Sequence, residues 1–286
     1  MFSGASILRC LARRGNGRIF FVGNSFARGL AFALQRLVKF GLAQLLEWLL
    51  RKHVYSRMEE KAQSPKGRTN ATAYSCELQL EGSEAQAHAG LLSMRFLWRP
   101  SLMVSAQHIL APEKPYLPDY CEGLPMQECY QPFFNGSRPG DILIQNIGRG
   151  YAEALQTTRG FIPSIATRLA IDDFDAFFAA DLFRGDVVHV TMPHAEPTGP
   201  YAGFDDWTDH INNVLVAHLA ANFSRVVVVD EAAFVRGDIR AEDAWEDAIH
   251  PPAQHYLAIL FHAFTELCGV EAEEERAAAR AGPAGG

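Results

Sequence analysis

The 286-residue chain lacks the sequence features that mark membrane-spanning, zinc-binding and nucleic-acid-binding proteins. Its longest apolar stretch, residues 27–50, is interrupted by Arg28, Arg36, Lys39 and Glu47, whereas a bilayer span needs about 20 residues with few charges. No pair of its five cysteines has the C-x-x-C spacing of a zinc site. It has no run of basic residues, and its net charge is −7. We therefore expect no transmembrane span, no metal site and no nucleic-acid partner.

The chain also lacks a recognisable secretory signal, although it contains three glycosylation sequons. The apolar core within residues 1–17 is too short for a signal peptide, so this segment has no assignment. The N-x-[ST] sequons begin at Asn70, Asn135 and Asn222, whereas about one would be expected by chance. Either the true amino terminus lies upstream and the protein enters the secretory pathway (Golgi or extracellular), or it is cytoplasmic and the sequons are unused.

Two of the five cysteines, Cys121 and Cys129, lie close together in a proline-rich stretch. They would form a disulfide in an oxidising compartment, and free thiols are the alternative. The sequence suggests no pairing for Cys10, Cys76 or Cys268.

Apolar runs alternate with helical patterns along much of the chain, in which 48% of the residues are hydrophobic and 21% are charged. The runs are continuous, as in strands that helices cover on both faces, and occupy residues 19–22, 141–145, 186–191 and 225–230. The spacing of apolar residues predicts helices over residues 25–58, 165–183, 207–221 and 255–267. This order predicts an α/β protein with a three-layer, doubly wound, mostly parallel sheet of the flavodoxin-like kind.

One domain, residues 18–268, accounts for these elements. It contains a long, loop-rich insertion at about residues 59–140, in which six prolines between residues 111 and 139 predict an irregular excursion. Two strand-like segments also lie within the insertion, at residues 73–80 and 91–99. Residues 269–286 are acidic and then rich in alanine and glycine, which predicts a flexible tail.

Polar residues follow the predicted strands, and the carboxyl ends of parallel strands share the edge where ligands bind. Ser25 follows the first strand through a tight Gly-Asn turn, Asn146 follows the second and His194 the third. Beyond the last strand, Asp247 and His250 stand three residues apart. An aspartate at this spacing can hold the Nδ1 proton of the imidazole and leave Nε2 to activate a serine.

Each of these residues also has a purely structural interpretation. Serine and asparagine cap helices, so Ser25 can be part of an ordinary strand-to-helix turn. Asn146 and His194 can be turn or loop residues, and Asp247 and His250 can belong to a surface loop that caps a helix.

Three blocks of the sequence resemble the GDSL/SGNH hydrolases, and within them the PC-esterase group. Residues 23–28 (GNSFAR) are similar to its G-D-S-x-x-R block, residues 141–151 to its D-[IV]-L-[IV]-x-N-x-G block, and residues 247–251 to its D-x-x-H-[PY] block. The group includes trichome-birefringence-like polysaccharide O-acetyltransferases, NXPE proteins and sialate O-acetyltransferases. The resemblance covers about residues 18–267 and implies the flavodoxin-like SGNH fold.

The resemblance implies a catalytic role for each matching residue. Ser25 is the implied nucleophile, His250 its general base and Asp247 the acid that orients the base. The backbone N–H of Ser25 and the side-chain amide of Asn146 are the implied donors to the oxyanion. The implied activity is hydrolysis or transfer of an acyl group, such as acetyl, through an acyl-enzyme.

The implied substrate is a glycan or another acylated small molecule, with an acyl donor in the case of a transferase. Arg28, Gly148 and Arg149 are candidates for contacts with it, and His194 is a further candidate from its place after a strand. No metal, nucleotide or other cofactor is implied.

The chain departs from the group's pattern at residues 149–151, where plant members carry aromatic and histidine residues, so its glycan preference can differ. Two further departures bear on activity. Asn24 stands where the group has aspartate, and no glycine block of the SGNH kind is identifiable. These departures keep a second hypothesis open, a catalytically inactive SGNH-fold protein that binds glycans or acts as a scaffold.

Overall fold

The structure, a computed structural model, describes the chain in eight segments. They are residues 4–15, 17–51, 73–79, 91–98, 126–147, 163–192, 205–231 and 253–269. The helices are α1 (Gly4–Arg13), α2 (Ser25–Arg51), α5 (Met126–Phe134), α7 (Pro163–Ala179), α8 (Asp205–Asn222) and α10 (Ala253–Cys268). The strands are β1 (Ile19–Gly23), β2 (Ala73–Gln79), β3 (Leu91–Trp98), β4 (Ile142–Asn146), β5 (Asp186–Val190) and β6 (Val226–Val229).

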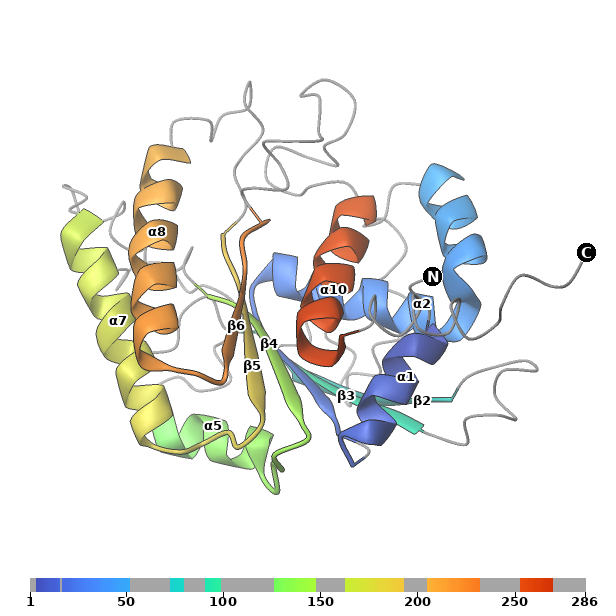
Figure 1. The fold of residues 1–286 in the computed structure, drawn as a ribbon, viewed down its shortest axis with the longest axis horizontal. Helices are drawn as coiled ribbons and strands as arrows, with labels where there is room; N and C mark the ends of the chain where they lie inside the picture. Colours follow the sequence, from blue (N-terminus) through green and yellow to red (C-terminus); the bar gives the residue numbers. More distant parts are fainter. Residues whose placement is uncertain are drawn as a thin grey trace, which may run out of the picture.

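The six strands form one sheet in the order β2-β3-β1-β4-β5-β6 (Figure 1). From β3 to β6 every neighbouring pair is parallel, and β2 alone pairs antiparallel, at the edge. The five parallel strands therefore follow the order 2-1-3-4-5, which is that of the flavodoxin-like doubly wound sheets. This topology confirms the fold class predicted from the sequence.

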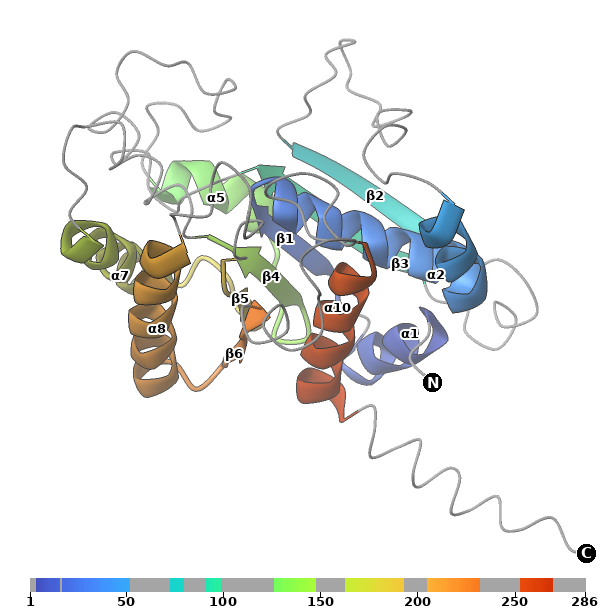
Figure 2. The same cartoon turned by 90° about the horizontal axis from the view of Figure 1, so that it is seen from above.

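Helices cover both faces of the sheet and complete the three layers (Figures 1 and 2). Helices α1, α2 and α10 share one hydrophobic core with their face of the sheet. Helices α5, α7 and α8 share a second core with the other face. Within the described segments, no helix is long and apolar enough to cross a membrane.

Helix α2 shows why the first of these layers forms. Its buried residues Phe26, Leu30, Leu34 and Leu37 recur at helical spacing and turn one stripe toward the sheet. The helix begins at Ser25, as predicted, and runs to Arg51 with a bend along its length (Figures 1 and 2).

Aromatic side chains fill the core on the opposite face. The Phe20 ring of β1 lies 5.6 Å from Phe133, 5.5 Å from Phe134 and 5.5 Å from Phe183, measured between ring centroids. Edge-on and tilted contacts at such distances are the favoured geometry of aromatic pairs. These contacts fix α5 against the middle of the sheet.

A buried carboxylate ties β1 and β4 together at the amino end of the sheet. Asp141 is fully buried and accepts hydrogen bonds from the backbone N–H of Arg18 (2.7 Å) and of Arg138 (2.9 Å). Its second oxygen also pairs with the guanidinium of Arg18 at 2.9 Å. Asp141 belongs to the same sequence block as Asn146, but it lies at the opposite end of the strand.

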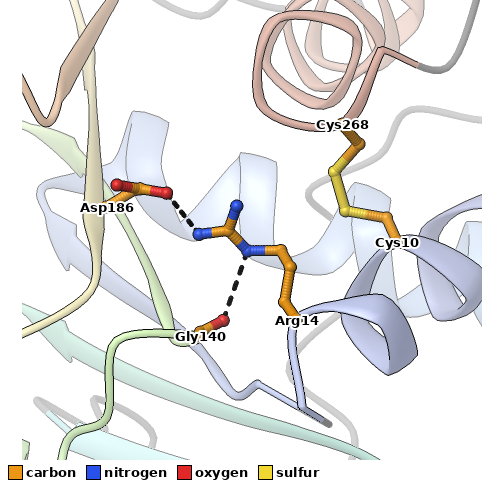
Figure 3. The surroundings of a disulfide bond; sticks show 5 residues. All are labelled: Cys10, Arg14, Gly140, Asp186 and Cys268. Carbon is orange, nitrogen blue, oxygen red and sulfur yellow. Dashed lines mark hydrogen bonds and ion pairs between the residues drawn. A yellow bond between two sulfur atoms is a disulfide. The ribbon is translucent and has the colours of Figure 1, made fainter.

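Helix α1 lies in the segment left without an assignment on sequence, and one side of it is part of the core. Helix α1 buries Ile7, Leu8 and Leu11. A disulfide joins Cys10 in α1 to Cys268 at the end of α10, 258 residues away (Figure 3). Arg14, one turn after Cys10, pairs with Asp186 at the start of β5 and so fixes α1 to the sheet.

The segment predicted as an insertion contributes to the sheet and to the core. Strand β3 lies between β1 and β2, so it is an inner strand. The prediction of an irregular excursion between residues 111 and 139 is wrong for residues 126–134, which form helix α5 with Pro132 inside it. The helix forms because Cys129, Tyr130, Phe133 and Phe134 bury one face, and this burial outweighs the proline.

Cys129 is also disulfide-bonded, to a cysteine whose side chain is not described. Cys121, its predicted partner, lies outside the described residues, so the pairing of Cys121 with Cys129 stays a prediction.

Candidate active site

Ser25 stands where the sequence predicts, at the first position of a helix directly after a strand. Strand β1 ends at Gly23, and α2 begins at Ser25, with a half-buried side chain. A Cβ on Gly23 would lie 2.6 Å from the carbonyl oxygen of Asn146, so only glycine fits this close approach of β1 and β4. The start of the turn that leads to Ser25 therefore lies directly against the carboxyl end of β4.

Asn24 caps the helix that Ser25 begins. Its side-chain oxygen accepts a hydrogen bond from the backbone N–H of Phe26 at 2.9 Å, and its carbonyl accepts one from the N–H of Arg28 at 3.1 Å. An aspartate would offer the same side-chain oxygen to this N–H. The departure from the G-D-S pattern thus leaves the local cap intact.

Arg28 lies one helical turn after Ser25 and is half-buried. Ser25 and Asn146 therefore lie at the carboxyl edge of the sheet, as the sequence predicts, and Arg28 lies one turn into α2 from that edge.

Asn146 is the last residue of β4 and pairs in register with Gly23. Its side chain is buried, and its Nδ2 group donates to the carbonyls of Val190 (3.0 Å) and Thr191 (2.8 Å) at the end of β5. Its Oδ1 atom is buried and has no hydrogen-bond partner within the described segments. The Asn146 amide thus lies at the predicted edge, and both of its Nδ2 hydrogens are donated to backbone carbonyls at the end of β5.

The polar contacts continue across the edge from β5 to β6. The Thr191 hydroxyl accepts a hydrogen bond from the backbone N–H of Glu231 at 2.8 Å and lies 3.3 Å from Oδ1 of Asp230. The backbone N–H of Thr191 donates to Val229 at 3.0 Å. These contacts align the carboxyl ends of the three strands β4, β5 and β6.

A buried acid–imidazole pair ends this chain of contacts, and sequence reasoning missed it. Nε2 of His255, in the first turn of α10, lies 2.7 Å from Oε1 of Glu231, and both side chains are buried. The available signal was Glu231, a carboxylate two residues after the end of an apolar strand. His255 was hidden by the apolar helix that it begins.

Two further buried polar residues lie side by side on the face toward α7 and α8. Gln145 and His189 are register partners in β4 and β5. Neither amide atom of Gln145 has a hydrogen-bond partner in the described part of the chain, and the same holds for Nδ1 of His189. Burial lowers the pKa of His189 to about 4, because the charged imidazolium loses its hydration there. The ring is therefore neutral near pH 7.

The remaining predicted site residues lie outside the described residues. They are Asp247, His250, Gly148, Arg149 and His194. Among the residues that are described, no group of three or more histidine, cysteine, aspartate or glutamate side chains could hold a metal ion.

No protein-family model matches the chain, and no curated protein matches its sequence. Among solved structures, the chain is similar to Axe2, an acetylxylan esterase from Geobacillus stearothermophilus, at 11% identity and a TM-score of 0.40, over 88% of this chain and 94% of that one. It is also similar to LAE5, an alpha/beta hydrolase enzyme from the metagenome of Lake Arreo, Spain, at 14% identity and a TM-score of 0.38, over 89% and 95% of the two chains. Similarity this distant carries no argument about activity.

Proposed function

We propose that the protein is a serine-dependent acyl-ester hydrolase or O-acyltransferase that acts on a glycan. The observation that supports this best is the position of Ser25. It begins a long helix at the carboxyl edge of a flavodoxin-like sheet, and the register places its turn beside Asn146. A hydroxyl held at a helix amino terminus lies in a field that favours the negative charge of an acyl-transfer intermediate.

In the proposed reaction, the Oγ atom of Ser25 attacks the acyl carbon while Nε2 of His250 takes the hydroxyl proton. Asp247 holds the imidazole by its Nδ1–H. The resulting oxyanion receives hydrogen bonds from the backbone N–H of Ser25 and from the Asn146 amide. The alcohol then leaves with the proton from His250, and water or a sugar hydroxyl accepts the acyl group from Ser25.

The acyl group of this proposal is acetyl, and its substrate contacts come from Arg28, Gly148, Arg149 and His194. The half-buried Arg28 supplies a cation one turn from the nucleophile, where it can orient an oxygen-rich ligand. The proposal requires no metal and no nucleotide.

Labelling with a fluorophosphonate tests the nucleophile, together with the burst of p-nitrophenol from p-nitrophenyl acetate. We expect stoichiometric labelling and a burst in the wild type, and neither in Ser25→Ala. Ser164→Ala is the matched control, since Ser164 is exposed in the first turn of α7. Labelling that persists in Ser25→Ala, or a wild type that never labels, would refute the serine mechanism.

The second candidate function is a catalytically inactive protein that binds glycans. The observation in its favour is that both Nδ2 hydrogens of Asn146 are donated to the carbonyls of β5. Under this hypothesis a glycan array shows binding that is unchanged in Ser25→Ala, and the wild type does not label.

We further infer that the protein folds in the secretory pathway. The Cys10–Cys268 disulfide is typical of an oxidising compartment. Two sequon asparagines are exposed and lie away from the carboxyl edge: Asn135 in the turn before β4, and Asn222 at the carboxyl terminus of α8. Peptide N-glycosidase treatment of protein from secreting cells should shift its mass, and Asn135→Gln and Asn222→Gln should each lose one glycan. Absence of any glycan would refute this inference.

A further inference from the structure

Glu231 and His255 bracket the segment that carries the proposed catalytic base. Glu231 is the second residue after β6, and His255 is the third residue of α10. The hydrogen bond between them, 2.7 Å from Nε2 to Oε1, joins two residues 24 apart in the chain. Asp247 and His250 lie in the sequence between these two residues, and His250 is only five positions before His255.

The pair is connected to the sheet edge as well as to the helix. The backbone N–H of Glu231 donates to the hydroxyl of Thr191, and the carbonyl of Thr191 accepts from the Asn146 amide. A continuous series of polar contacts therefore runs from the proposed oxyanion donor to the first turn of α10. Because these groups are buried, each bond is stronger than it would be in water.

A second contact fixes the same turn of α10 to the helix of the nucleophile. The ring of Tyr256, the neighbour of His255, lies 5.1 Å from the ring of Phe26, the residue after Ser25. A Cβ on Gly29 would lie 2.6 Å from Cζ of this tyrosine, so the ring lies directly against α2. His255 thus fixes the start of α10 to β6, and Tyr256 fixes it to α2.

We propose that Glu231 and His255 form a positioning pair, which holds the first turn of α10 so that His250 reaches Ser25. This proposal rests on the proposed function. The pair is buried at the edge and touches no substrate in this role. Its importance follows from geometry, because a displacement of about 1 Å between a nucleophile and its base can lower the rate by about 10²-fold.

Four variants test the proposal in the full chain. Glu231→Ala and His255→Ala remove the bond, whereas Glu231→Gln keeps an oxygen that can accept from the Nε2–H of His255. Asp175→Ala is the matched control, because Asp175 pairs with His218 at the same 2.7 Å, but on exposed surface near the carboxyl terminus of α8. The probe is p-nitrophenyl acetate, with kcat and KM measured separately on samples shown to be folded by circular dichroism.

We expect kcat to fall by roughly 10- to 100-fold in Glu231→Ala and His255→Ala, with KM changed by less than about twofold. We expect Glu231→Gln to recover most of the rate and Asp175→Ala to match the wild type. Unchanged kcat in folded Glu231→Ala, or a loss in Glu231→Gln as large as in Glu231→Ala, would overturn the proposal.

Hydrogen–deuterium exchange separates this proposal from the proposed function. Peptides that cover residues 232–252 should exchange faster in Glu231→Ala than in the wild type, while peptides from β1 and α2 should not change. If the wild type shows no Ser25-dependent labelling, the proposed function fails, and the exchange result still decides whether the pair positions this segment. Equal exchange in both proteins would overturn the positioning role.

Discussion

Replacing Asp141 with alanine tests how strongly the fold depends on the buried carboxylate at the amino end of β4. The substitution removes the acceptor of two backbone N–H groups and one guanidinium, all within 2.9 Å. Asp141 is fully buried, and the side chain of Arg18 is 17% exposed, so little water can replace the lost bonds. The variant therefore leaves polar groups of Arg18, the residue before β1, and of the turn before β4 unsatisfied.

The expected cost follows from these contacts. Removing one partner of a buried ion pair lowers the free energy of unfolding by about 3–5 kcal/mol. We expect about 4 kcal/mol for Asp141→Ala, which corresponds to a fall in Tm of roughly 10 °C for a domain of this size. Asp141→Asn keeps one oxygen but turns an NH₂ group toward donors, so we expect about half that cost.

Scanning calorimetry and urea denaturation measure this effect, with Asp172→Ala as the matched control. Asp172 pairs with Arg168 at 2.9 Å in α7, but the two side chains are 51% and 76% exposed. An exposed pair of this kind contributes only about 0.3–0.5 kcal/mol. If Asp141→Ala unfolds within about 2 °C of Asp172→Ala, the argument from burial is wrong.

Three other substitutions follow from buried groups. Gln145→Leu should raise the free energy of unfolding, measured in urea, by about 1 kcal/mol, because neither amide atom has a partner in the described segments. A free energy of unfolding below that of the wild type would show that the amide binds a water or a ligand. Gly29→Ala should cost about 1–3 kcal/mol, less in a Tyr256→Ala background, because its Cβ would meet the tyrosine ring. His189 has a pKa of about 4 in the folded protein and about 6.5 in the unfolded chain, so below pH 6.5 the unfolded state binds a proton that the folded state does not. The free energy of unfolding should therefore be unaffected by this residue above pH 6.5 and fall by up to about 3 kcal/mol as the pH drops toward 4. His189→Leu should flatten this part of the pH profile of Tm, and an unchanged profile would contradict the assignment to His189.

The central sheet could be predicted because its strands are buried on both faces. Continuous apolar runs such as those of β4 and β5 have few alternatives, and the helices between them force parallel connections. The inner strand β3 was harder to place. The strand that precedes it in the chain, β2, pairs with it antiparallel, so the parallel pairing of β3 with β1 does not follow from its nearest neighbour in the sequence.

The roles of α1 and of its cysteine could not be predicted, because they depend on contacts across the whole chain. Cys10 and Cys268 are 258 residues apart, and only the packing of α1 beside α10 brings them together. A ten-residue segment with one apolar stripe matches many short surface helices. Its burial depends on packing against α2 and α10, which are far from it in the sequence or follow other elements.

At the candidate site, residues adjacent to a strand end were predictable and pairs between distant elements were not. Ser25 and Asn146 are fixed by the register of β1 and β4, which the sequence pattern implies. The Glu231–His255 pair depends on how α10 docks on β6, and no local pattern sets that docking.

Asn146 decides between the enzyme and the binding protein. To donate to an oxyanion, its amide must release the carbonyl of Val190 or Thr191, and a buried carbonyl without a partner costs about 1–3 kcal/mol. One oxyanion donor contributes about 2.7–4 kcal/mol to transition-state stabilisation. Moving one hydrogen bond from a β5 carbonyl to the oxyanion is therefore favourable over most of these ranges once negative charge develops beside Ser25, and unfavourable without that charge. The contacts of Asn146 with β5 are thus compatible with the proposed acyl-transfer reaction, and Asn24, which keeps the cap of α2, gives no reason to expect an inactive protein.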